Sequence, residues 1–177
     1  MRLKPIITCI LAVILCCCES GHKIILPDDY SHVYTKDGRS DDFKPDKSKN
    51  KFILYFSQKG LMKPCLSELW TSSADSVFKE NPDWEFIIYY KGSLADSLDL
   101  RSLLEKYNCG AYIVISENDE FKKDNGIGKI LQTSYFLDSN NKVLGQWLVG
   151  DDSFEKQFND ILNSANCQEF LRKSVIS

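Results

Sequence analysis

The chain has 177 residues, of which 43% are hydrophobic and 27% charged, and its formal net charge is −3 at pH 7. This length suits one domain, and this balance of residues is ordinary for a globular protein. The mild acidity argues against a nucleic-acid surface, which needs a basic stripe. We therefore expect no nucleic-acid partner.

The N-terminus differs in composition from the rest of the chain. Arg2 and Lys4 precede an apolar stretch from Ile6 to Leu15, and three consecutive cysteines follow it. A basic start and about ten apolar residues are typical of a secretory signal peptide, and the stretch is too short to span a bilayer. The expected signal peptide covers residues 1–17.

The cysteine cluster at the end of this stretch resembles a bacterial lipobox, Leu15-Cys16-Cys17-Cys18. In a lipobox, leucine lies three residues before the modified cysteine and small residues fill the two places between. We expect lipidation at Cys18, with Cys16 and Cys17 as alternative sites. The other possibility is that the protein is cleaved and secreted without a lipid. Acyl chains would anchor the protein to a bacterial membrane, at its periplasmic or surface face. Envelope proteins are then candidate partners.

Three thiols remain after signal cleavage and lipidation: Cys65, Cys109 and Cys167. The expected compartment permits disulfides, and an odd number leaves at least one thiol without a partner in the chain. Cys109 and Cys167 could form a bridge, but the sequence does not decide which two cysteines pair.

The mature chain divides into a polar tether over 18–30, one domain over 31–163 and a C-terminal tail over 164–177. An early strand is expected at Val33-Tyr34-Thr35, with a turn at Asp37-Gly38. The main strands are predicted over 51–57, 84–90, 111–115, 133–138 and 142–149, and the helices over 64–79, 95–107 and 152–162.

Pro64 fits the first position of the first helix, after a loop over 57–63. A final helix is expected to begin at Asp151, Asp152 or Ser153, which are good N-cap residues. The alternation of strands and helices indicates parallel strands, and the last two strands form an antiparallel hairpin. The predicted fold class is α/β, with a central mixed sheet of four or five strands flanked by helices.

Two segments resemble thioredoxin-like proteins of the TlpA-like or redoxin type. In that family an apolar strand runs into a loop, and C-x-x-C then opens a helix. Here Phe52-Ile-Leu-Tyr-Phe56 leads to Met62-Lys63-Pro64-Cys65. Further along the chain, Thr133-Ser-Tyr-Phe-Leu-Asp138 resembles the T-T-F-x-I-D stretch of the family. The resemblance covers about residues 30–163 and implies a thioredoxin-like fold.

The chain departs from the family pattern at two places. Met62 stands where the resemblance implies the first, attacking cysteine, and a thioether cannot form a thiolate. Gln132 stands where the family has a proline, usually cis, so a trans bond is expected because a non-proline cis bond costs about 2.5–4 kcal/mol. The motif is therefore degenerate at Met62 and Gln132, with Lys63, Pro64 and Cys65 retained beside them.

These departures favour a non-catalytic binding or scaffold protein that keeps the fold. The alternative is a thiol-disulfide oxidoreductase that acts through Cys65 alone or with a distant cysteine. On the first interpretation, Met62→Cys would create C-K-P-C and with it insulin reductase activity. We expect no cofactor and no metal, because His22 and His32 lack metal-ligand spacing and no cysteine pair is present to bind copper.

Overall fold

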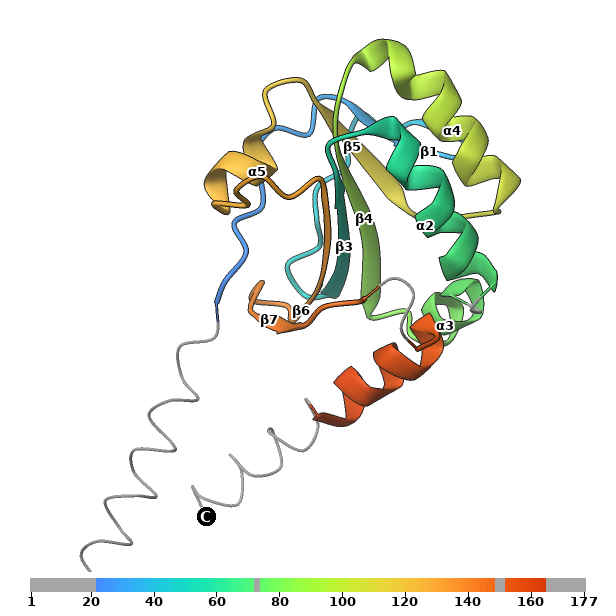
Figure 1. Ribbon diagram of the computed structural model, residues 1–177, viewed down its shortest axis with the longest axis vertical. Coiled ribbons are helices and arrows are strands. Elements are labelled where there is room, and N and C mark those ends of the chain that lie inside the picture. Colours follow the sequence, from blue (N-terminus) through green and yellow to red (C-terminus); the bar gives the residue numbers. More distant parts are fainter. Residues whose placement is uncertain (1–21, 72–73, 149–151, 165–177) are drawn as a thin grey trace, which may run out of the picture.

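A computed structural model describes residues 22–71, 74–148 and 152–164. One mixed sheet runs through the centre, with helices on either side of it (Figure 1). The strands are β1 (Val33–Thr35), β2 (Gly38–Arg39), β3 (Asn50–Phe56), β4 (Trp84–Lys91), β5 (Tyr112–Ser116), β6 (Gln132–Leu137) and β7 (Val143–Gly145). The helices are α2 (Lys59–Thr71), α3 (Ala74–Glu80), the 3-10 turn η1 (Leu94–Asp96), α4 (Ser97–Lys106), α5 (Glu120–Asp124) and a last helix over residues 154–164.

The strand order in the sheet is β2-β1-β5-β4-β3-β6-β7. Strands β3, β4 and β5 are parallel, and the others run antiparallel to their neighbours. Phe52 of β3 lies opposite Phe86 of β4 on one side and Phe136 of β6 on the other. The predicted parallel arrangement of these central strands is confirmed.

Strand β3 is buried along its length because both of its faces are covered. Phe52, Leu54 and Phe56 face a core shared with α2, α3, α4 and the last helix. Ile53 and Tyr55 face a second core, which α5 and the N-terminal segment cover. Side chains alternate between the two faces of a strand, so a continuous apolar run fits a strand buried on both sides.

The sheet has seven strands, so the prediction of four or five was wrong. The two additional strands are β1, which pairs with β5, and β2, which pairs with β1. The turn between them lies at the predicted position, and Gly38 has a φ of 147°, which favours glycine. Three residues with strand character do not indicate which sheet edge they join, so this pairing depends on tertiary contacts.

The first predicted helix, over 64–79, is in fact two helices, α2 and α3. Helix α2 already begins at Lys59, so the predicted loop over 57–63 and the placement of Pro64 at the first helical position were wrong. Inside the helix, Pro64 cannot donate a backbone hydrogen bond to the Gly60 carbonyl. Burial of the apolar face of α2 offsets this missing bond.

The other two predicted helices agree with the structure to within a few residues. The segment predicted over 95–107 forms η1 and α4, and the last helix begins after Ser153, whose hydroxyl accepts a hydrogen bond from the Lys156 amide (3.3 Å). Of the three candidate N-caps, Ser153 therefore holds this place. No helix in the described ranges has the length and hydrophobicity needed to cross a membrane.

Strand β7 ends at Gly145, although a strand was predicted over 142–149. The β6–β7 ladder is irregular at Phe136, and beyond it the Ser134 hydroxyl replaces backbone pairing. This hydroxyl donates to the Trp147 carbonyl (2.6 Å) and accepts from the Trp147 amide (2.9 Å). Beyond β7, the chain is thus held at Trp147 by a side chain.

The segment from residue 22 packs against the domain, although 18–30 was assigned to the tether. Ile24 is buried, and its amide donates to the Asn141 carbonyl (2.9 Å). The Asn125 side chain accepts from the Ile25 amide and donates to the Ile25 carbonyl, both at 2.7 Å. The predicted signal peptide, Cys18 and residues 165–177 of the tail lie outside the described residues.

Candidate functional site

The start of α2 lies beside the start of β6, at the carboxyl end of β3. Only Ser57 and Gln58 separate β3 from α2. The Ser57 amide and hydroxyl both donate to the Leu131 carbonyl, at 2.8 and 3.1 Å. These bonds hold the first turns of α2 against the residue that precedes β6.

The four residues predicted to correspond to C-x-x-C, Met62 to Cys65, lie within α2, on two different faces. Met62 is fully buried and Cys65 is 2% exposed, whereas Lys63 and Pro64 are exposed. Residues three apart lie on the same side of a helix, so Met62 and Cys65 both face the core. Met62 therefore occupies a packed position inside the helix and does not lie at its exposed N-terminus.

Gln132, the first residue of β6, contacts Cys65 directly. Its side-chain amide nitrogen donates to the Cys65 Sγ atom at 2.8 Å. The described residues contain no cis peptide bond, so the bond before Gln132 is trans, as expected. Two of the residues selected from the sequence thus form one site, although 67 positions separate them.

The environment of Cys65 keeps its thiol protonated. Burial raises the pKa of Cys65 to about 11, the negative charge of Glu68 contributes to the rise, and the Gln132 donor opposes it. The thiolate is the reactive form of cysteine. At neutral pH this side chain is therefore a neutral, shielded thiol.

The second described thiol, Cys109, lies at the other end of the sheet. It follows α4 and precedes β5, whereas Gln132 beside Cys65 pairs with Phe56 at the carboxyl end of β3. Cys109 is fully buried, and burial raises its pKa. Both cysteines are free thiols, and Cys167 lies outside the described residues.

A small groove adjoins Gln132 on the side away from β3. Its volume is about 220 Å³, and it lies between β6 and the chain that leaves β7. Large exposed apolar side chains lie in the same segments: Ile130 and Leu131 before β6, and Leu148 after β7. The residues that line the groove are Gln132, Thr133, Ser134, Gln146, Trp147 and Leu148.

An ion-pair network at the first residue of α2 was not anticipated from the sequence. The Lys59 ammonium lies 2.9 Å from an Asp96 oxygen and 2.7 Å from an Asp99 oxygen. The Tyr90 hydroxyl donates to the other Asp96 oxygen at 2.9 Å. These contacts raise the pKa of Lys59 and lower that of Asp96. The partners are about 30 to 40 positions from Lys59 in the chain, so no local pattern could have revealed them.

The described residues contain no group of three histidine, cysteine or acidic side chains that could hold one metal ion. His22 precedes the first core residue and His32 precedes β1. The site around Cys65 therefore offers one thiol, one amide and a groove with an apolar margin.

No family model and no curated protein matches the chain. Solved structures do match it. A thiol:disulfide interchange protein DsbE from Chlorobium tepidum is 18% identical with a TM-score of 0.55, covering 82% of this chain and 99% of its own. The reduced 2-Cys peroxiredoxin of Plasmodium vivax is 15% identical with a TM-score of 0.61, covering 84% and 98%.

A thiol-disulfide oxidoreductase from Bacteroides fragilis is 12% identical with a TM-score of 0.52, covering 75% of this chain and 97% of its own. These similarities establish a thioredoxin-like fold, as the resemblance implied. At such low identity they establish the fold alone, so the chemistry has to be argued from the site itself.

The protonated state of Cys65 can be tested through the pH dependence of its alkylation. A pKa of about 11 leaves roughly one thiol in a thousand ionised at pH 8. The rate of iodoacetamide labelling, read at the Cys65 peptide by mass spectrometry, should rise about tenfold per pH unit from pH 7 to pH 10.

Gln132→Met removes the donor to sulfur and should move this pH profile further to the alkaline side. Lys63→Met, an exposed change on the same helix, serves as the matched control and should leave the profile unchanged. A plateau in the labelling rate below pH 8 would show that Cys65 is a reactive thiolate.

Proposed function

We propose that this protein binds a partner polypeptide through a thioredoxin-like fold and does not catalyse dithiol–disulfide exchange. The observation that carries the proposal is the state of Cys65, which is 2% exposed and bonded to Gln132. Exchange requires a thiolate that attacks a disulfide and a second thiol that releases the mixed disulfide. Cys65 is the sole cysteine of α2.

The start of α2 also supports this proposal. A helix N-terminus favours a thiolate because the macrodipole and free backbone amides stabilise negative charge. Ser57, Gln58 and Lys59 occupy this region, and the Lys59 ammonium is held by two carboxylates. The place suited to an attacking thiol therefore holds a serine, a glutamine and an ion pair.

The groove beside Gln132 is the proposed binding surface. Its volume of about 220 Å³ is smaller than most ligand pockets and suits one side chain of a partner. The exposed side chains of Ile130, Leu131 and Leu148 offer apolar contact next to it. Apolar side chains of this size in a partner's extended segment would complement this surface.

The alternative function, disulfide exchange through Cys65 alone or with a distant cysteine, has one favourable observation. The Gln132 donor would stabilise a thiolate at Sγ. Burial opposes it and has the larger effect on the pKa. The two functions make opposite predictions in an activity assay.

Insulin reduction with dithiothreitol distinguishes them. The wild-type protein and Cys65→Ser should both match the dithiothreitol background. Met62→Cys should also stay at background, because position 62 is buried within α2 and a thiol there would be shielded. This replaces the expectation from the sequence that the change would create activity.

Turnover above background that Cys65→Ser abolishes would instead establish a thiol enzyme. Cys109→Ser and Cys167→Ser would then identify the distant partner, since loss in either variant assigns the resolving role. An active thioredoxin serves as the positive control for the assay.

Binding at the groove can be measured with short random peptides selected by display on the protein. Selected peptides should shift backbone amide resonances of Gln132 and Thr133 in NMR spectra. Leu148→Asp should weaken binding by at least about tenfold, because it places a charge in an apolar contact. Leu98→Asp, at a site 69% exposed on α4, is the matched control and should bind normally. Equal loss in both variants would contradict this location.

We further propose that the protein is held on the bacterial cell envelope by a lipid on Cys18. If so, three residues lie between the lipidated position and His22, and the Cα atoms of Cys18 and His22 are at most about 14 Å apart. The domain would then lie close to the membrane, on the side where Ile25 and Asn125 meet.

Metabolic labelling with a clickable palmitate analogue tests the anchor. Wild-type protein should be labelled and Cys18→Ser should not. Labelling that persists in Cys18→Ser and disappears in Cys16→Ser or Cys17→Ser would move the site to that cysteine. Absence of label in the wild type would show that the protein is not lipidated, which leaves secretion without a lipid as the explanation of the signal peptide.

A further inference from the structure

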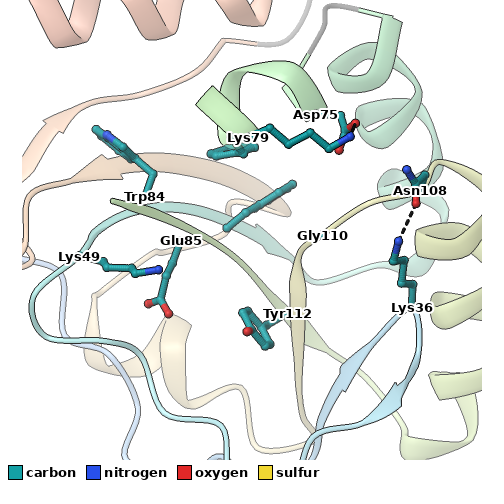
Figure 2. A pocket seen from close by; sticks show the side chains of 11 residues that line it. Lys36, Lys49, Asp75, Lys79, Trp84, Glu85, Asn108, Gly110 and Tyr112 are labelled. Atoms are coloured by element: carbon teal, nitrogen blue, oxygen red, sulfur yellow. Dashed lines mark hydrogen bonds and ion pairs between the residues drawn. The ribbon is translucent and has the colours of Figure 1, made fainter. Parts of the chain in front are cut away.

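A second cavity lies at the opposite end of the sheet from Cys65. It has a volume of about 350 Å³ and is formed at the amino ends of β4 and β5, beside α3. Figure 2 shows side chains from several elements around it, with Lys36 and Asn108 on one side and Lys49 on the other. Its size lies within the range of small-molecule sites.

One part of the cavity wall is aromatic. Phe78 and Phe86 stack with ring centroids 5.2 Å apart, and both line the cavity together with Trp84. Tyr112 lines it from the other face of the sheet, where its ring stacks on Phe43 with centroids 4.1 Å apart. Phe78 and Tyr112 are half-buried, so parts of their rings remain accessible. Such rings favour offset or edge-on contact with another aromatic group.

The polar part of the wall contains donors without a carboxylate partner. The Lys36 ammonium is bonded to the Asn108 side-chain carbonyl at 2.6 Å and forms no ion pair with the described residues. It has two further N–H donors, and Figure 2 shows the Asn108 side chain facing it through the amide oxygen. An ammonium and an adjacent amide can together bind the two oxygens of one carboxylate.

The acidic groups of the cavity are already engaged. Asp75 forms an ion pair with Lys79. Glu85 accepts a hydrogen bond from the Asp46 amide at 2.9 Å and lies near Lys49, on the far side from Lys36. The charge left without a close counter-ion at the Lys36 side is therefore positive.

Gly110 keeps the space between these two parts open. A Cβ atom built at this position would meet no atom within 4 Å, and its backbone is not in the left-handed region. Because Gly110 lines the cavity, a large side chain here is expected to reduce the space in it without straining the backbone.

We propose that this cavity binds a small aromatic carboxylate. Lys36 and Asn108 hold the carboxylate, and the ring lies in the space at Gly110 against the accessible part of Phe78. The site uses no residue of the Cys65 region, so its test is independent of the test of the function proposed above.

Phenylacetate is a suitable probe, with benzyl alcohol and acetate as its neutral and ring-free counterparts. Titration of the purified protein should shift the amide resonances of Gly110 and Tyr112 in a saturable way with phenylacetate. Benzyl alcohol and acetate should each bind at least about tenfold more weakly, since each lacks one half of the recognition.

Three variants sharpen the test. Lys36→Met should weaken the binding of phenylacetate by at least about tenfold and leave the binding of benzyl alcohol unchanged, because only the charged contact is lost. Gly110→Leu should abolish binding of both while the thermal unfolding midpoint stays within a few degrees. Lys63→Met, an exposed change on α2 away from the cavity, should bind like the wild type.

Three results would overturn the proposal. Acetate could bind as well as phenylacetate, which would mean that the positive charge of Lys36 attracts any small anion and that the ring is not recognised. Gly110→Leu could bind normally while folded, which would move the ligand elsewhere. Shifts could fail to saturate or could centre on Gln132, which would leave no site at Gly110.

Discussion

Burial of β3 on both faces is the constraint on which the rest of the structure depends. The Phe52 ring packs against Phe78 of α3, Phe86 of β4, Phe136 of β6 and Phe154 of the last helix, so four separate elements meet on one side chain. Because this core fixes β6 beside β3, it also fixes Gln132 beside the chain that leaves β3. The turn into α2 takes two residues, and the second turn of that helix then carries Cys65 to Gln132.

The same packing determines what the site can do chemically. A helix that begins immediately after a buried strand directs its apolar face, including Met62 and Cys65, into the core. The thiol is therefore shielded by burial as well as deprived of a second cysteine. Its one described polar contact is the Gln132 side-chain amide, which donates a hydrogen bond to the buried sulfur. A thioredoxin-like fold here surrounds a buried thiol that packs as part of the core.

The parallel strands separate two sites at opposite ends of the sheet. At the carboxyl ends lie Cys65, Gln132 and the groove between β6 and the chain after β7. At the amino ends lies the aromatic and cationic cavity around Gly110. Closely packed aromatic rings on both faces of the sheet fill the region between the two ends. A single small domain can thus offer two surfaces of different chemistry.

The sequence by itself determined the central strands, their parallel order and the fold class, because continuous apolar runs and alternation with helices are local signals. From the resemblance to thioredoxin-like proteins it also predicted an altered site at Met62 and Gln132, with Cys65 retained beside them. It could not place the start of α2, since proline statistics favoured Pro64 while burial of the helix face extended the helix back to Lys59. Only the tertiary structure brought Gln132 onto Cys65, paired Lys59 with Asp96 and Asp99, and left space at Gly110. The two contacts join residues more than thirty positions apart, and the space at Gly110 depends on the absence of neighbouring atoms. A contact of this kind and an empty space leave no local pattern in the sequence.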